Sequence, residues 1–137
     1  MLLGFEHVGM TSSDPDRTIA FYCDLIGLRL ALRKPASGGE LLFLDAGGGM
    51  LEIFCRSDAA GASDVPPTQA GMRHLTFAFD NIDPLIGQLE AAGVEIVERP
   101  RPAINTEMLH RVAFVRDPDG ILVELAERSP SRLAAGS

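Results

Sequence analysis

The sequence lacks a long uninterrupted hydrophobic run, although 46% of its 137 residues are hydrophobic. No stretch of about 18 consecutive apolar residues occurs, so we expect no membrane-spanning helix. Residues 1–6 contain no basic region and no long apolar segment. We therefore expect no signal peptide and a cytoplasmic protein.

Basic residues are also scarce. The chain has 12 Lys and Arg against 19 Asp and Glu, which gives a net charge of −7 at pH 7 and an isoelectric point near 4.8. This balance argues against a broad surface for nucleic acid or for an anionic membrane. A few local arginines can still hold a small anionic molecule, so we expect a small-molecule substrate.

Cysteine is nearly absent, because the sequence has only Cys23 and Cys55 and no CxxC motif. Two cysteines without a secretory signal predict reduced thiols rather than a disulfide framework. The missing CxxC argues against a thiolate zinc site. Cys55 is expected on the core face of its strand, where it would be chemically inert. The chain length predicts one domain.

The sequence does contain a pattern that occurs twice. Repeat 1 covers about residues 5–56 and repeat 2 about residues 72–127, joined by a linker over 57–71 that is rich in small residues and proline. Asp-Pro pairs at Asp14 and Asp83 predict helix starts, and Gly27 and Gly93 predict helix ends. Each repeat therefore predicts the order β-α-β-β-β, an α+β fold.

The predicted strands follow from short apolar runs between turn residues. They cover residues 5–12, 28–33, 40–45 and 50–55 in repeat 1, and residues 74–80, 94–98, 111–116 and 121–127 in repeat 2. Proline-containing loops are expected over 35–39 and 99–102. Residues 128–137 are expected to form a tail, frayed from residue 129.

Four residues stand at matching positions of the repeats, namely His7, Glu52, His74 and Glu124. Because side chains alternate along a strand, each of them shares a face with small or mixed neighbours, while the opposite face is wholly apolar. Two imidazoles and two carboxylates suit a divalent ion of borderline hardness: nickel, cobalt, manganese, zinc or iron. The pattern predicts one metal site to which each repeat contributes one His and one Glu.

These residues resemble the vicinal oxygen chelate superfamily. The resemblance covers residues 5–127 and rests on His7-Val8-Gly9, on Phe21-Tyr22 before Leu25-Ile26-Gly27-Leu28, on His74-Leu75-Thr76-Phe77, and on Asp117-Pro118-Asp119-Gly120 leading to Glu124. It implies two βαβββ repeats that form a cupped, mostly antiparallel sheet cleft. In short members two chains often share their sites, so the resemblance also implies a homodimer with sites shared between chains. The alternative is a monomer whose two halves close on each other, which the linker allows as well.

Glyoxalase I uses His, Glu, His and Glu in chain order, which the four candidate ligands match. The resemblance implies a lyase or isomerase that moves a proton through a metal-stabilised enediolate, with glutathione as a candidate co-substrate. Glu124 is the first choice for the proton-transferring residue and Glu52 the second. The alternatives are an enzyme like methylmalonyl-CoA epimerase, which typically has Gln in place of Glu52, a dioxygenase, or a non-catalytic antibiotic-binding protein of the bleomycin-resistance type.

Some positions depart from the named enzymes. Short bacterial glyoxalases carry a glutathione-holding arginine where Thr11 stands, and Leu42, with Glu40 close by, stands near the position of the catalytic Glu of the epimerase. Arg99, Arg101 and Arg111 are candidates to anchor a substrate carboxylate or phosphate, although solvated loop charges explain them as well. Further weak candidates are His110 as a site residue, and Met72, Met108, Phe43 and Phe54 as pocket lining.

Overall fold

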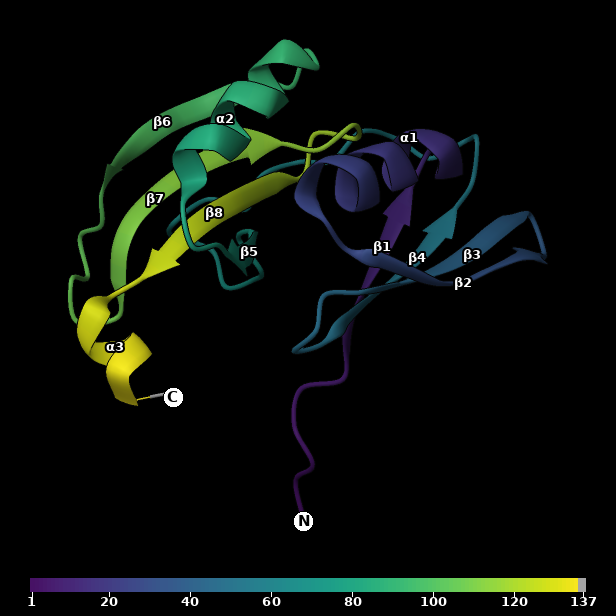
Figure 1. Ribbon diagram of the computed structural model, residues 1–137. Helices are drawn as coiled ribbons and strands as arrows, with labels where there is room; N and C mark the ends of the chain where they lie inside the picture. The colour runs from purple at the N-terminus through teal and green to yellow at the C-terminus, as the bar shows by residue number, and fades with distance from the viewer. Residues whose placement is uncertain (136–137) are drawn as a thin grey trace. The chain divides into compact units, whose positions relative to one another are not determined.

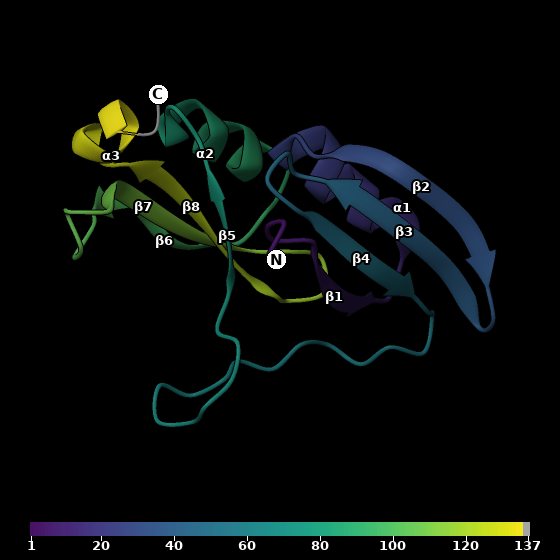
Figure 2. The ribbon, with the colours of Figure 1, turned by 90° about the horizontal axis from the view of Figure 1, so that it is seen from below.

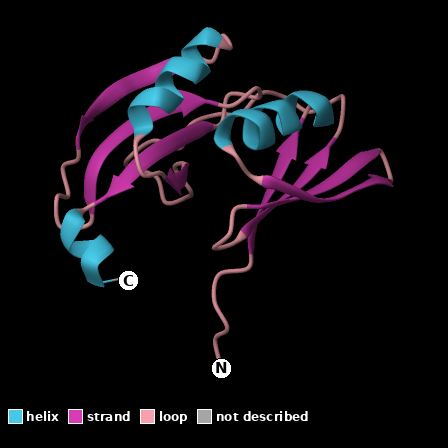
Figure 3. Cartoon of the chain, viewed as in Figure 1, coloured by secondary structure: helices cyan, strands magenta, loops and turns pink. Residues whose placement is uncertain are grey.

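The computed structural model describes residues 1–135 and comprises two compact units, Met1–Gly61 and Ala62–Ser137. Each unit contains one four-stranded mixed sheet with a helix on one of its faces (Figures 1 and 3). The element order is β-α-β-β-β in both units, with α3 added after the second. The predicted α+β fold of two βαβββ repeats is confirmed.

Unit 1 is built from β1 (His7–Ser12), α1 (Pro15–Ile19), η1 (Ala20–Ile26), β2 (Arg29–Ala36), β3 (Gly39–Asp45) and β4 (Met50–Cys55). Its sheet has the order β1-β4-β3-β2. The first strand pairs with the last in parallel, whereas β2, β3 and β4 pair antiparallel. The parallel pair joins the two strands that carry His7 and Glu52.

The helix of unit 1 begins and ends where the sequence predicts. The Asp14 carboxylate accepts hydrogen bonds from the backbone N–H groups of Asp16 and Arg17, and Pro15 occupies the first helical position. The last turns, η1, form a π-helix, which the apolar periodicity does not reveal. Gly27 ends it with φ of +106°, a left-handed conformation that glycine adopts without strain.

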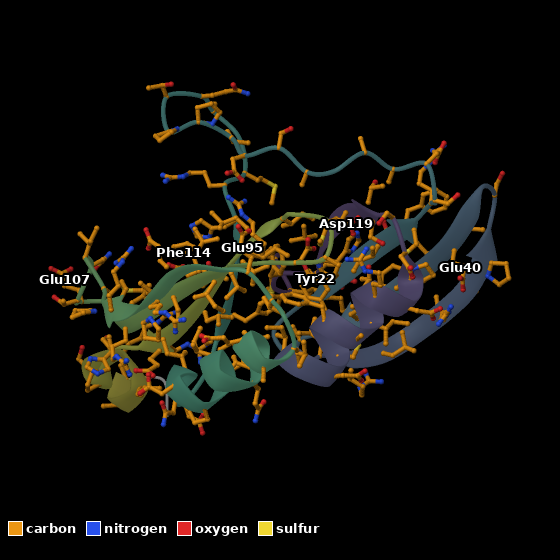
Figure 4. The ribbon with its side chains drawn as sticks, turned by 90° about the horizontal axis from the view of Figure 1, so that it is seen from above. Tyr22, Glu40, Glu95, Glu107, Phe114 and Asp119 are labelled. Carbon is orange, nitrogen blue, oxygen red and sulfur yellow. The ribbon has the colours of Figure 1, made fainter. Side chains whose placement is uncertain are left out.

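The core of unit 1 lies between this helix and one face of the sheet. Tyr22, labelled in Figure 4, is fully buried, and so are the alternate strand residues Leu42, Leu44 and Ile53. In β4 this burial confirms that the apolar face predicted from strand parity is the core face. The opposite face, which carries Glu52, is left half-buried.

Unit 2 repeats this topology with β5 (Leu75–Ala78), α2 (Ile82–Ala91), β6 (Ile96–Pro102), β7 (Leu109–Arg116), β8 (Leu122–Arg128) and α3 (Pro130–Ala135). Its sheet has the order β5-β8-β7-β6, again with the first and last strands parallel. The expected start of α2 at Asp83 is wrong by two residues. Asn81 is the N-cap and accepts from the backbone N–H of Asp83, which lies in the first turn.

The two proline-containing loops are largely strand in the structure. Strand β2 continues through Pro35 to Ala36 and turns at residues 37–38, and β6 continues to Pro102. Both are the outer strands of their four-stranded sheets, where proline is tolerated at positions whose nitrogen faces away from the neighbouring strand. The expected loops over 35–39 and 99–102 are therefore wrong.

The expected frayed tail is also wrong over the described residues. Residues 130–135 form α3, and the buried Ser129 before it donates its hydroxyl to the backbone carbonyl of Glu107 at 2.7 Å. Residues 136–137 of the expected tail lie outside the described residues. In the part of the chain that is described, no helix has the length and apolarity needed to cross a membrane.

The predicted linker contains no helix or strand, and Figure 2 shows it as a long loop between β4 and β5. Its second half is attached to unit 2. Arg116 donates to both carboxylate oxygens of Asp64, at 2.6 and 2.9 Å, and the backbone N–H of Ala62 donates to the carbonyl of Asp119 at 2.9 Å. The Arg116 guanidinium holds the pKa of the Asp64 carboxyl below its usual range.

Candidate functional site

In unit 1 the His–Glu pair lies across the parallel strands β1 and β4. His7 is paired in register with Met50, and Gly9 with Glu52. Because alternate residues share a face, His7 and Glu52 lie diagonally on the same face of the sheet. The His7 imidazole is partly exposed, and its Nδ1 lies 3.5 Å from the exposed carboxylate of Glu6. The strand topology thus brings the first predicted pair together.

In unit 2 the corresponding pair is connected by hydrogen bonds. His74 immediately precedes β5, and Thr76 is paired in register with Glu124 of β8. The Thr76 hydroxyl donates to Glu124 Oε1 at 2.8 Å, and its Oγ1 lies 3.0 Å from His74 Nδ1. The second predicted pair is therefore also brought together, with Thr76 between its members.

An aromatic ring contacts the imidazole in each unit. Phe43 is the register partner of Glu52, and its ring meets His7 edge-on at a centroid distance of 5.8 Å. Phe114, labelled in Figure 4, is the register partner of Glu124 and meets His74 edge-on at 5.4 Å. The same His–Glu–Phe arrangement thus occurs twice, and the edge-on rings restrict how each imidazole can turn.

Phe43 is a candidate for pocket lining from the sequence alone, whereas Phe114 and Thr76 are not predicted as site residues. Two signals could have found them. Phe114 precedes its glutamate by nearly the same spacing as Phe43 does, and Thr76 follows His74 at the distance that returns a strand residue to the same face.

The two carboxylates differ in burial. Glu52 is half-buried, whereas Glu124 is 9% exposed. Beside Glu124, an apolar cluster of Ala103, Val112 and Ala126 packs with Leu109 and Phe114. Val112 and Ala126 are register partners on the same face as Glu124. On this face the Glu124 carboxylate therefore lies next to a small buried apolar cluster.

The three candidate arginines do not form one cluster. Arg111 lies on the helix side of the sheet, where it donates to both carboxylate oxygens of Asp83 at 2.9 and 3.0 Å. Arg99 donates to Glu90 of α2 at 2.6 Å. Neither faces the His74–Glu124 pair, so the structure argues against them as anchors of a substrate bound there.

Arg101 is the candidate that lies on the same face as Glu124. It is paired in register with Val112, and its guanidinium carbon lies 6.0 Å from the centre of the Phe114 ring. It donates to Glu98 Oε2 at 2.8 and 3.1 Å, and this ion pair is part-exposed. An anionic substrate group would therefore have to compete with Glu98 for this cation.

The remaining candidates carry no chemistry in this arrangement. His110 lies within β7 and is exposed, and Met72 and Met108 are also exposed. Neither Cys23 nor Cys55 forms a disulfide within the described residues. Cys55 is buried, as predicted, and accepts a hydrogen bond from the Ser12 hydroxyl at 3.0 Å. Burial raises the pKa of the Cys23 thiol, with a further contribution from Asp24, which keeps it in its less reactive form.

The donor atoms of the two pairs fit a divalent metal ion. Each unit supplies one imidazole and one carboxylate on one face, and nowhere among residues 1–135 do three or more His, Cys, Asp or Glu side chains lie together as a group that could hold an ion. His74 has its Nδ1 engaged by the Thr76 hydroxyl, so Nε2 is the nitrogen left for a ligand role. Two pairs together would supply four ligands of the type expected from the sequence.

Most of the chain resembles a known protein family. A family model described as the Glyoxalase/Bleomycin resistance protein/Dioxygenase superfamily matches residues 4–125. The probable lactoylglutathione lyase of Synechocystis sp. is 26% identical over 128 residues, covering 92% of this chain and 96% of that protein. The probable chloroplastic lactoylglutathione lyase of Arabidopsis thaliana is 28% identical over 91% of this chain, which spans only 36% of that protein.

Solved structures share the fold. The glyoxalase family protein from Enterococcus faecalis has a TM-score of 0.72 at 29% identity, with 89% of this chain and 95% of that chain covered. TnmS3, an antibiotic-binding protein from Streptomyces, has a TM-score of 0.67 at 22% identity, with 93% and 98% covered. The second likeness shows the fold alone, so the fold accommodates proteins of both kinds.

Proposed function

Because the chain belongs to the glyoxalase/bleomycin resistance protein/dioxygenase superfamily, we propose that it is a metal-dependent lyase or isomerase of the glyoxalase I type. The proposed ligands of one divalent ion are His7, Glu52, His74 and Glu124. The observation that carries the proposal is the same His–Glu–Phe arrangement on one sheet face of both units. Relatives named as lactoylglutathione lyases support a glyoxalase-like role.

When bound, a divalent ion at these residues supplies a Lewis acid for two adjacent oxygens of the substrate. The imidazoles of His7 and His74 hold their positions through the edge-on contacts with Phe43 and Phe114. The proposed substrate is a small α-oxygenated compound, with the adduct of glutathione and an α-ketoaldehyde as the first candidate. The buried apolar cluster beside Glu124 would limit the access of water to that carboxylate.

The reaction requires a carboxylate that takes a proton from one substrate carbon and returns it to the neighbouring carbon. Glu124 is buried and bonded to Thr76, which restrains its movement. Glu52 is half-buried, and among residues 1–135 no side chain is hydrogen-bonded or ion-paired to its carboxylate. The geometry therefore favours Glu52 as the proton-transferring residue, the reverse of the order that the resemblance suggests.

Metal content tests the proposal directly. Protein purified without chelator and soaked with nickel, cobalt, manganese or zinc is expected to retain about one divalent ion per chain, measured by elemental analysis. Glu124→Ala is expected to lose the ion, because it removes one of four ligands. Glu90→Ala, which removes an exposed carboxylate paired with Arg99, is the matched control and should retain it.

An ion retained by wild type and control but lost in Glu124→Ala would justify assaying methylglyoxal with glutathione. Wild-type protein that takes up none of the four metals would contradict the proposed enzyme. It would instead support a non-catalytic binding protein, in which Glu52→Gln leaves ligand binding unchanged.

We also propose that two chains form a homodimer in which each metal site takes one His–Glu pair from each chain. Mixing two inactive proteins tests this proposal. One carries His7→Ala with Glu52→Ala, and the other carries His74→Ala with Glu124→Ala. If sites are shared between chains, each mixed dimer contains one intact site and one without ligands, so unfolding and refolding the two together should restore metal binding.

Sites built within one chain predict no restoration, because every chain in the mixture lacks one pair. Subunit exchange is verified by tagging one of the two proteins and recovering the mixed dimer. A mixed dimer that binds no metal would contradict the shared site.

A further inference from the structure

The hydroxyl of Thr76 stands between the two proposed ligands of unit 2. A threonine hydroxyl has one hydrogen to donate and two lone pairs to accept with. Its hydrogen is directed to Glu124 Oε1 at 2.8 Å, because a carboxylate can only accept. The 3.0 Å contact with His74 Nδ1 must then have the imidazole as donor. The proton of neutral His74 therefore lies on Nδ1.

This arrangement determines which ring nitrogen of His74 is available. With Nδ1 protonated and bonded to Thr76, the lone pair of the neutral imidazole lies on Nε2. The edge-on contact with Phe114 restrains the same ring. The partner on the non-coordinating nitrogen is known to fix tautomer and ring orientation in metal sites generally. Thr76 thus acts on both proposed ligands through one oxygen atom.

Unit 1 contains no such connection. The residue that corresponds to Thr76 is Gly9, which is paired in register with Glu52 and has no side chain. His7 Nδ1 instead lies 3.5 Å from the carboxylate of Glu6, whose side chain is 77% exposed. The two His–Glu pairs share position and aromatic contact but differ in the hydroxyl.

We propose that Thr76 is a positioning residue that preorganises the second His–Glu pair, by holding His74 with Nε2 open and Glu124 with Oε1 fixed. The expected effect on metal affinity rests on the proposed function. The expected His74 tautomer does not depend on it. The asymmetry makes the pair of unit 2 the rigid one and the pair of unit 1 the adaptable one.

The test compares Thr76→Val, which removes the hydroxyl at nearly constant shape, with Thr76→Ser, which keeps it. Thr11→Val is the matched control, because Thr11 is an exposed threonine on the same face of β1 as His7. Nitrogen NMR of the imidazoles in metal-free protein reports each tautomer. Thermal unfolding confirms that every variant folds, and the signals of His7 give an internal reference.

We expect wild type, Thr76→Ser and Thr11→Val to show His74 protonated on Nδ1, and Thr76→Val to lose this preference. We expect the dissociation constant for zinc to rise about 10–100-fold in Thr76→Val, the range typical of lost partners of metal ligands, and to stay near wild type in the other two. Rescue by serine separates the hydroxyl from mere packing.

An unchanged His74 tautomer in Thr76→Val would overturn the inference. A changed tautomer with unchanged zinc affinity would overturn the positioning role while leaving the metal site intact. Wild-type protein that binds no zinc would instead contradict the proposed function, and the NMR comparison would still decide whether Thr76 fixes His74.

Discussion

Replacing Glu52 with glutamine is expected to lower kcat by about 10²–10⁴-fold, the usual contribution of a general base, with the bound metal retained. The amide oxygen of glutamine can still bind a metal ion, but the amide cannot take up a proton from a substrate carbon. Glu52 suits proton transfer because it is half-buried and, in the described chain, carries no side-chain hydrogen bond. Turnover and metal content are measured on the same preparation.

Glu124→Gln is the matched comparison, because it shows which of the two carboxylates transfers the proton. Its amide oxygen can still accept the Thr76 hydroxyl and bind the metal, so we expect a smaller loss of turnover than in Glu52→Gln. If Glu124→Gln shows the larger loss with its metal retained, the proton-transferring residue is Glu124, and the assignment made from burial and hydrogen bonding is wrong.

Replacing Gly39 with alanine is expected to lower the free energy of unfolding by about 1–3 kcal/mol, the range for forced overpacking. Gly39 begins β3, and a Cβ there would overlap the backbone carbonyl oxygen of Cys55 on β4. A backbone atom cannot turn aside as a side chain can, so the end of the β3–β4 ladder would have to separate. Urea unfolding followed by circular dichroism measures the change.

Two other glycines provide matched controls for this substitution. A Cβ at Gly48 would meet no heavy atom within 4 Å, so Gly48→Ala is expected to change stability little. The atoms nearest to a Cβ at Gly49 would belong to the ring of Phe5 and the carbonyl of Glu6, and the exposed Phe5 ring can move away. Equal destabilisation by all three alanines would contradict the steric explanation for Gly39.

The overall fold was predictable because the sequence repeats its own signals. The predicted helix start at Asp14-Pro15 is confirmed, because the Asp14 carboxylate caps N–H groups of the first turn. Strand parity also holds in β4, because Leu51, Ile53 and Cys55 are buried while Glu52 between them is half-buried. It does not separate the two faces of β8, where Glu124 and Ala126 are buried as well as Val123 and Leu125. Alternation is a local property of a strand, and a single sequence is enough to show it.

Long-range pairing was less accessible to sequence analysis. The register of β6 against β7 is irregular, and Arg101 lies over the Phe114 ring. Arg99 and Arg111 instead form ion pairs with residues of α2. Arginines that are close in the sequence therefore do not have to lie on the same face of the sheet. The role of Thr76 depends on which residue of β8 lies opposite it, and that register is set by tertiary pairing. A proline in a single sequence indicates a loop, because the sequence does not show which strands will be the outer strands that tolerate proline.

The parallel pairing of the first and last strands in each unit also bears on how the protein is made. Within unit 1, His7 lies on the first strand to be synthesised and Glu52 on the fourth. The two strands can therefore pair only after nearly the whole unit has been synthesised. The same holds for His74 and Glu124. A nascent chain that has not reached the fourth strand of a unit thus carries the histidine of that unit without its glutamate, and neither pair can form before its sheet is complete.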